Sequence, residues 1–238
     1  MKINLKKEEI KLEKILEQIK GKLIVSCQAL EYEPLYGSNL MARMALAAFQ
    51  GGAAGIRANT YDDIVEIKAT VNLPVIGIVK RDYKDSSIYI TPTIKEVREI
   101  EAAGAEIVAL DCTLRKRPNG EKLEDLIKAI RKEFPKLLIM ADISTVEEGI
   151  NAYRLGVNLI STTLSGYTEY TLSKEGPDIE LVKELVSKVS IPVIAEGKID
   201  TPEQARLCLE AGAHAIVVGG AITRPKQITE RFIKVINL

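Results

Sequence analysis

Two strand-like segments of this chain begin alike and end in opposite charges. Residues 74–80 read Pro-Val-Ile-Gly-Ile-Val-Lys, and residues 192–197 read Pro-Val-Ile-Ala-Glu-Gly. Continuous runs of β-branched apolar residues are typical of parallel strands that are covered by helices. In such sheets, catalytic groups lie at the carboxyl ends of the strands. Lys80 and Glu196 are therefore a candidate pair of acid and base.

Almost all of the remaining apolar runs are also followed by a polar residue or a glycine. They include Gln28, Arg57, Asp111, Asp142, Thr163 and Gly219. This density favours a small, polar ligand, because buried polar groups need hydrogen-bond partners. The two aspartates have a second interpretation, since a carboxylate at a strand end often caps the next helix. Asp142 would then cap a predicted helix over residues 144–155.

The elements that carry these residues are eight short apolar runs, separated by segments with helical periodicity. The runs are Leu23–Cys27, Ala54–Ala58, Pro74–Val79, Glu106–Leu110, Leu137–Ala141, Asn158–Ser161, Pro192–Ala195 and Ala215–Gly219. Eight strand–helix alternations without a break in composition predict a (β/α)8 TIM barrel, which we expect to form one domain over residues 23–238. A doubly wound open sheet is the alternative. It is disfavoured because no Gly-x-Gly-x-x-Gly motif opens the first unit.

Residues 1–22 precede the first predicted strand. Ile10, Ile15, Leu16 and Ile19 form a broad apolar face there, which predicts an extra N-terminal helix. We expect its role to be structural, covering the bottom of the barrel or a neighbouring chain.

Composition indicates an ordinary soluble protein. Lys plus Arg and Asp plus Glu each number 33 in 238 residues, so no net charge attracts nucleic acid or an anionic membrane. The first ten residues alternate charged with apolar residues and do not resemble the apolar core of a signal peptide, and no apolar run is long enough to span a bilayer. Cys27, Cys112 and Cys208 are far apart, and we expect them to be reduced and buried. These features together favour a cytoplasmic location.

The turns after the last two strands have the composition of a phosphate site. Gly219-Gly220 precedes Arg224 after the eighth run, and Gly197-Lys198 follows the seventh. In these barrels, phosphate often binds backbone N–H groups after strands seven and eight. Glycine lets the backbone approach the oxygens, and arginine adds charge-assisted hydrogen bonds. A Gly-Gly pair alone also suits a tight turn, but its position in the barrel favours a phosphorylated substrate.

Other polar features give weaker signals. The run Arg115-Lys116-Arg117 suits either an anion contact or a solvated turn. His214, the only histidine, lies next to the start of the eighth strand, at the non-catalytic end. No cluster of His, Cys, Asp and Glu has the spacing of a metal site, and no cysteine has a histidine partner for nucleophilic catalysis.

These strings resemble the N-acylmannosamine-6-phosphate 2-epimerase family. The matching strings are Val25-Ser-Cys-Gln-Ala-Leu30, Gly55-Ile-Arg-Ala-Asn59, Pro74-Val-Ile-Gly-Ile-Val-Lys-Arg-Asp-Tyr83, Ile90-Thr-Pro-Thr93, Met140-Ala-Asp-Ile-Ser-Thr145, Ser161-Thr-Thr-Leu-Ser-Gly-Tyr167, Ile194-Ala-Glu-Gly197 and Val218-Gly-Gly-Ala-Ile-Thr-Arg-Pro225. The match runs in order from about Leu23 to the C-terminus, and it falls on almost every strand end. Only the N-terminal segment looks longer than the family's usual start.

The resemblance implies interconversion of N-acetylmannosamine 6-phosphate and N-acetylglucosamine 6-phosphate, a step in bacterial sialic-acid and aminosugar catabolism. It also implies a TIM barrel, a dimer, and no cofactor or metal requirement. The family's catalytic lysine and glutamate match Lys80 and Glu196. With Thr163 and Lys198, which lie at the same strand ends, the implied ligand-holding residues form the predicted substrate-binding set: Gln28, Arg57, Asp142, Thr163, Gly197, Lys198, Gly219, Gly220 and Arg224.

Epimerisation at C2 needs a base for a proton that is acidic only in the open-chain aldehyde. Our hypothesis is that Lys80 is this base and that Glu196 positions hydroxyl groups and assists proton movement. Desolvation lowers the pKa of a lysine, and Arg57 or Arg81 nearby would lower that of Lys80 further, whereas Glu196 opposes this change. The proton's position within the pair does not follow from the sequence.

Two other functions use the same residues. A Schiff-base lyase or synthase of the phosphate-binding barrels also places a lysine on a strand. A sugar-phosphate sensor would bind the ligand without isotope exchange.

Overall fold

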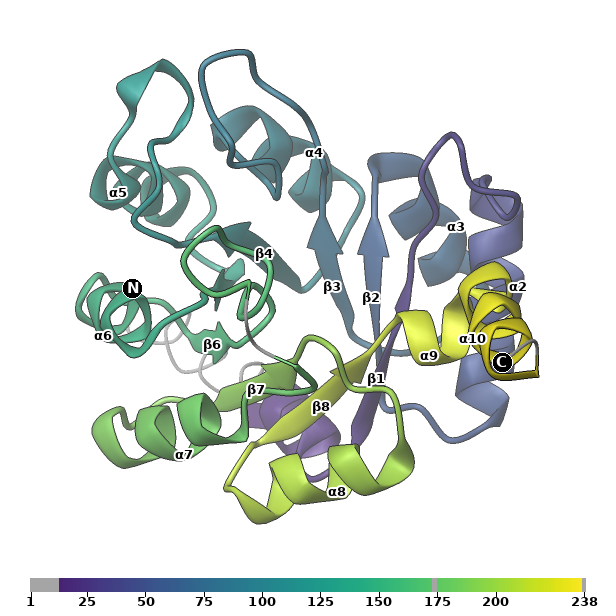
Figure 1. Cartoon of the computed structure of the whole chain (residues 1–238). Helices are drawn as coiled ribbons and strands as arrows, with labels where there is room; N and C mark the ends of the chain where they lie inside the picture. Colours follow the sequence, from purple (N-terminus) through teal and green to yellow (C-terminus); the bar gives the residue numbers. More distant parts are fainter. Residues whose placement is uncertain (1–12, 173–174, 237–238) are drawn as a thin grey trace.

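The computed structural model describes residues 13–172 and 175–236. Eight parallel strands pair in chain order, and the last pairs with the first, so the sheet is a closed barrel (Figure 1). The strands are β1 (Leu23–Cys27), β2 (Gly55–Asn59), β3 (Val75–Ile78), β4 (Ile107–Asp111), β5 (Leu138–Asp142), β6 (Leu159–Ser161), β7 (Val193–Glu196) and β8 (Ala215–Val218). The TIM barrel is confirmed, and the open-sheet alternative is wrong because β1 pairs with both β2 and β8.

Helices connect successive strands around the outside of the barrel (Figure 1). They are α2 (Ser38–Gln50), α3 (Tyr61–Thr70), α4 (Ile94–Ala102), α5 (Leu123–Glu133), α6 (Val146–Arg154), α7 (Ile179–Lys188), α8 (Pro202–Glu210), α9 (Gly220–Thr223) and α10 (Pro225–Ile236), with a 3-10 turn at Pro118–Gly120. Thr93, Thr145 and Thr201 each begin a helix with a capping box, in which the hydroxyl and the third helical side chain exchange hydrogen bonds with the backbone.

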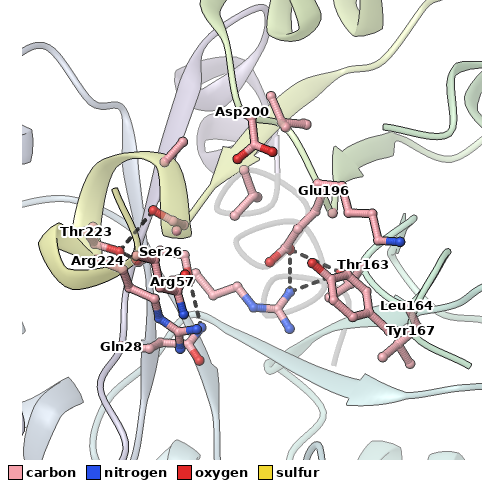
Figure 2. Close-up of a pocket in the computed structure, with 18 of the residues that line it drawn as sticks. Ser26, Gln28, Arg57, Thr163, Leu164, Tyr167, Glu196, Asp200, Thr223 and Arg224 are labelled. Atoms are coloured by element: carbon pink, nitrogen blue, oxygen red, sulfur yellow. Dashed lines mark hydrogen bonds and ion pairs between the residues drawn. The ribbon is translucent and has the colours of Figure 1, made fainter. Parts of the chain in front are cut away.

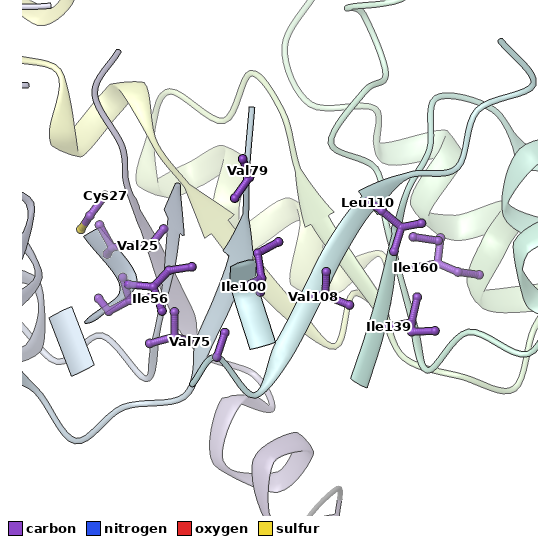
Figure 3. Packing of buried hydrophobic residues seen from close by; sticks show 14 of the residues in the cluster. Val25, Cys27, Ile56, Val75, Val79, Ile100, Val108, Leu110, Ile139 and Ile160 are labelled. Atoms are coloured by element: carbon purple, nitrogen blue, oxygen red, sulfur yellow. The ribbon is translucent and has the colours of Figure 1, made fainter. Parts of the chain in front are cut away.

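Side chains of each strand alternate between two apolar layers. Val25, Ile56, Val108 and Ile139 point outward and pack against the helices (Figure 3). Residues of opposite parity, such as Ile24, Ile76, Ile107 and Met140, fill the barrel interior. This period of two decides which residue at each strand end points inward.

The amino end of the barrel is closed by the helical residues 13–19. Ile15 and Ile19 are buried and join the interior cluster. His214 Nε2 lies 2.9 Å from the carbonyl oxygen of Leu16, at the end of the barrel opposite the strands' carboxyl ends. Residues 1–12 of the predicted helix lie outside the described residues. None of the helices within the described ranges is long and apolar enough to cross a membrane.

The strand that leads to Lys80 packs without space for a larger side chain. A Cβ on Gly77 would lie 2.5 Å from Ile100 of α4 and 2.9 Å from Ile64 of α3. After β3 the chain returns antiparallel, with a bridge between Lys80 and Ile90. The Lys80 backbone N–H also donates to Asn59 Oδ1 of β2 at 2.9 Å. The lysine backbone is therefore held from two sides.

Gly77→Ala should destabilise the barrel by about 1–3 kcal/mol, because the added methyl group overpacks two fully buried isoleucines. Gly51→Ala is the matched control: its φ is −77° and its nearest neighbours would lie at an ordinary 3.4 Å. We expect the control to change the free energy of unfolding by less than about 0.5 kcal/mol. Urea denaturation measures both, and equal stabilities for the two variants would contradict this packing analysis.

Candidate active site

A cavity of about 610 Å³ opens at the carboxyl ends of the strands. It brings together ten of the eleven residues predicted for the site: Gln28, Arg57, Lys80, Thr163, Glu196, Gly197, Lys198, Gly219, Gly220 and Arg224. The eleventh, Asp142, does not line it. Figure 2 shows the arrangement from close by.

Arg57 lies in the barrel interior and is 1% exposed. Its Nη2 donates to Asp142 Oδ2 at 2.5 Å, and its Nη1 contacts Asp142 Oδ1 at 3.1 Å. The same Nη1 donates to Glu196 Oε2 at 2.7 Å, which Figure 2 marks with a dashed line. The Thr163 hydroxyl contacts Asp142 at 2.7 Å and Glu196 at 3.1 Å. One guanidinium therefore holds two carboxylates in a fixed geometry.

Asp142 acts behind the cavity wall. Its side chain is fully buried, and both of its oxygens accept hydrogen bonds from Arg57. The alternative of a helix cap is wrong, since the Thr145 side chain caps α6 instead. The position fits orientation of Arg57 better than direct contact with a ligand.

Lys80 faces two guanidinium groups inside the cavity. Burial lowers its pKa to about 8, and the charges of Arg224 and Arg57 contribute, while Glu33 and Glu196 oppose the change. The second guanidinium is thus Arg224 and not Arg81, which instead pairs with Glu96 and Glu99. A lysine of this kind has an accessible neutral form near pH 7.

Glu196 is shifted in the opposite direction. Burial raises its pKa to about 7, and the neighbouring Asp142 carboxylate adds to the effect, against Arg57, the Thr163 hydroxyl and Lys80. A lysine lowered toward neutrality and a glutamate raised toward neutrality are both able to release and accept protons at the same pH. Because they interact, their titrations belong to the pair.

The turn after β7 needs glycine. Gly197 has a φ of +105°, and a Cβ there would lie 3.3 Å from the carbonyl oxygen of Thr163. Lys198 follows, also with a positive φ of 53°, and its Nζ lies 5.4 Å from the centre of the Tyr167 ring. After β8, α9 begins at Gly220, and the Thr223 hydroxyl donates to the Ser26 carbonyl oxygen at 2.8 Å. The glycine turns, Lys198 and Arg224 thus all line the cavity.

Tyr89 and Tyr167 also line the cavity and were not in the predicted set. Tyr89 directly precedes Ile90, which also lines the cavity, in the segment that returns after β3. Tyr167 lies in a loop, where no periodicity points to the cavity.

The basic run after β4 has a structural role that neither prediction anticipated. Arg117 is 3% exposed and donates to the carbonyl oxygens of Asp111 and Pro92. Arg115 pairs with Asp111 at 2.5 Å. Asp111 also accepts a hydrogen bond from the Thr113 N–H at 3.0 Å, so it holds a turn.

Two further expectations concern cysteine and metal. Cys27, Cys112 and Cys208 are free and buried, as predicted. Within residues 13–172 and 175–236, no group of three or more His, Cys, Asp and Glu side chains could hold a metal ion.

Most of this chain is similar to known proteins. Residues 41–238 match the family model described as "Putative N-acetylmannosamine-6-phosphate epimerase". A relative from Clostridium perfringens (strain SM101 / Type A) with the name "Putative N-acetylmannosamine-6-phosphate 2-epimerase" is 58% identical over 94% of this chain and 100% of its own length. One of the same name from Clostridioides difficile (strain 630) is 56% identical over 94% of this chain and 100% of its own length.

Two solved structures are similar to this chain. The N-acetylmannosamine-6-phosphate 2-epimerase of Clostridium perfringens superposes with a TM-score of 0.89 at 57% identity, over 92% of this chain and 95% of that one. Thiamine phosphate pyrophosphorylase from Pyrococcus furiosus shares the fold, with a TM-score of 0.62 at 21% identity, over 93% of this chain and 98% of that one.

Asp142→Asn should destabilise the protein by about 3–5 kcal/mol, because it leaves the buried Arg57 without its main counter-charge. Glu99→Gln is the control. It weakens a partly exposed ion pair with Arg81 and should cost about 1 kcal/mol or less. Denaturant unfolding measures both variants. An Asp142→Asn protein as stable as the control would mean that the carboxylate is not needed to hold the guanidinium.

Proposed function

Because the chain belongs to the N-acetylmannosamine-6-phosphate epimerase family, we propose that it interconverts N-acetylmannosamine 6-phosphate and N-acetylglucosamine 6-phosphate by proton transfer at C2. One observation carries this proposal beyond the relatives' names: Lys80 and Glu196, with pKa values moved toward neutrality, line a single cavity beside a glycine-rich turn. The step belongs to aminosugar and sialic-acid catabolism.

The sugar reacts as its open-chain aldehyde. Neutral Lys80 removes the C2 proton, and the electron pair of the C–H bond moves into an enolate whose negative charge lies on the C1 oxygen. Return of a proton to the opposite face of C2 gives the epimer. The fixed cation Arg57 lines the same cavity and favours the anionic intermediate. Glu196 exchanges protons with substrate hydroxyl groups and with Lys80.

The other predicted residues bind the substrate in this proposal. Gln28 and Thr163 contact the hydroxyl and acetamido groups, while Asp142 acts through Arg57. Phosphate binds at the turns around Gly197 and Gly219-Gly220, where Lys198 and Arg224 add positive charge. Binding energy from this remote group is available to hold the reacting carbon in place.

The test is solvent deuterium uptake at C2, followed by NMR with N-acetylmannosamine 6-phosphate in deuterated water. Wild-type protein should incorporate label, and Lys80→Ala should lose incorporation by at least about a thousandfold. The value of kcat/KM should rise with pH toward about 8, because the base is neutral only above its pKa. Lys80→Arg is the control for charge, since a guanidinium keeps the charge but does not deprotonate.

A Lys80→Ala protein that exchanges at the wild-type rate would refute the assignment of the base. Trapping of substrate on Lys80 by borohydride would instead support the Schiff-base alternative. Ligand binding by wild-type protein without isotope exchange would support the sensor.

We infer further that the protein is cytoplasmic, with three free, buried cysteines in support, and that it forms a homodimer through α10. No side chain of the described helix α10 is buried, although Ile228, Phe232 and Ile236 recur at helical spacing. Phe232 is 67% exposed and Ile236 72%. Figure 1 shows α10 at the periphery, beyond α9. A second copy of the chain would cover this apolar stripe.

Light scattering should give twice the 26.2 kDa mass of one chain for the wild-type protein. Phe232→Asp combined with Ile236→Asp should give a monomer, because two carboxylates cannot be buried in an apolar contact. Thr229→Asp on the same helix is the control and should stay dimeric. A monomeric wild-type protein, or a dimeric double variant, would rule out this interface.

A further inference from the structure

Glu33 lies just outside the lining of the cavity and holds one of its cations. It belongs to the loop between β1 and α2, and its side chain is 17% exposed. Its Oε1 lies 3.4 Å from Arg224 Nε, and its Oε2 accepts a hydrogen bond from the Leu30 N–H at 2.8 Å. The two oxygens therefore have different partners, one in the backbone of its own loop and one beyond β8.

One end of this ion pair is held within the loop after β1, and the other is tied to β1 itself. The Glu33 N–H donates to the Leu30 carbonyl oxygen at 2.8 Å, which closes the turn that carries the carboxylate. On the other side, the Thr223 hydroxyl ties the end of α9 to Ser26 at 2.8 Å, directly before Arg224. Figure 2 shows Arg224 on the same side of the cavity as Ser26 and Gln28. Neither partner can move far without breaking backbone hydrogen bonds.

The contact selects one edge of the guanidinium. An arginine side chain offers two edges to an oxyanion, one through Nε and one through its two terminal nitrogens. Glu33 contacts Nε, so the edge through Nε is engaged by the protein itself. The terminal nitrogens are left for a ligand of the cavity that Arg224 lines. A lysine at this position would have no edge to select.

Glu33 also enters the charge balance at Lys80. Burial lowers the pKa of Lys80, and the charges of Arg224 and Arg57 lower it further, while those of Glu33 and Glu196 raise it. Removing the Glu33 carboxylate would leave the effect of Arg224 less opposed. The Glu33 carboxylate therefore contacts Arg224 and also raises the pKa of Lys80.

We propose that Glu33 is a positioning residue that holds Arg224 by its Nε edge and presents the terminal nitrogens to the substrate phosphate. The proposal deepens the proposed function and rests on its assignment of phosphate to Arg224. It is distinct from competition, in which a carboxylate would merely occupy the cation and weaken anion binding.

Binding of inorganic phosphate, measured by calorimetry, tests the orientation without needing turnover. Glu33→Gln should weaken phosphate binding about three- to tenfold, the effect of one misaligned charge-assisted hydrogen bond. The amide oxygen can still accept from Leu30, which preserves the loop. Glu31→Gln, two residues away on an exposed side chain, should bind like the wild-type protein.

The orientation model makes a second demand on the same measurement. In an Arg224→Lys background, Glu33→Gln should not weaken phosphate binding, because an ammonium has no edge to orient. Unchanged or tighter binding by the Glu33→Gln single variant would overturn the proposal in favour of competition. An equal loss in the arginine and lysine backgrounds would overturn it in favour of a role in loop structure.

The pH profile of activity tests whether the Glu33 carboxylate raises the pKa of Lys80. In Glu33→Gln the acidic limb of kcat/KM should move to lower pH by roughly half a unit, because a negative charge that raises the pKa of Lys80 is gone. Ionisation of the substrate phosphate contributes equally to both profiles. Glu33→Asp keeps the negative charge and should keep the acidic limb in place. An acidic limb that stays in place or moves to higher pH in Glu33→Gln would refute this effect of Glu33 on Lys80. If the wild-type protein showed no C2 exchange, the proposed function would fail while phosphate binding still tested Glu33.

Discussion

The site depends on a guanidinium buried inside the barrel. On β2, Arg57 takes an inward position, whereas most inward residues of the other strands are apolar, such as Ile24, Ile76 and Met140. Removing a cation from water costs several kcal/mol unless paired groups offset it, and here Asp142 and Glu196 supply both charge and hydrogen bonds. The cluster has one positive and two negative charges. A proton on the more accessible carboxylate, Glu196, relieves this excess.

Burial is the largest cause of the pKa shifts of Lys80 and Glu196, and nearby charges modify both. Burial raises the pKa of Glu196, and because Asp142 contacts Arg57 with both oxygens, Glu196 has only part of the guanidinium's field to oppose this rise. At Lys80 the charges act in the other direction. Arg224 and Arg57 lower its pKa more than Glu33 and Glu196 raise it. Both shifts depend on exclusion of water. Arg57 thus acts on the base and on its partner at once, without needing to touch either reacting proton.

Much of the barrel and the list of site residues was predictable because two periodicities agree. Apolar runs gave the strands to within about one residue at each end, and a period of two along each run places Lys80, Asp142 and Glu196 on the interior face. The function of Asp142 was not predictable. A strand-end carboxylate can cap a helix, bind a ligand or hold a cation, and the choice here depends on Arg57, from a strand that is not its neighbour in the barrel.

Arg117 and Glu33 show the same limit from the other direction. Local composition suggests exposure for both, yet Arg117 is buried on backbone carbonyls and Glu33 finds a partner at the opposite end of the chain. The contact of Glu33 with Arg224 exists only because barrel closure pairs β1 with β8. No local pattern encodes that closure.

Closure of the barrel also determines which elements hold Arg224 in place. Arg224 is the residue between α9 and α10, so it is bounded by a helix tied to β1 on one side and by an exposed helix on the other. The tie through Thr223 fixes where its backbone leaves the barrel, and Glu33 fixes its side chain. In a dimer formed through α10, the second boundary would become fixed as well. The anchor would then lose less conformational entropy when phosphate binds, because its freedom would already be restricted before the ligand arrives.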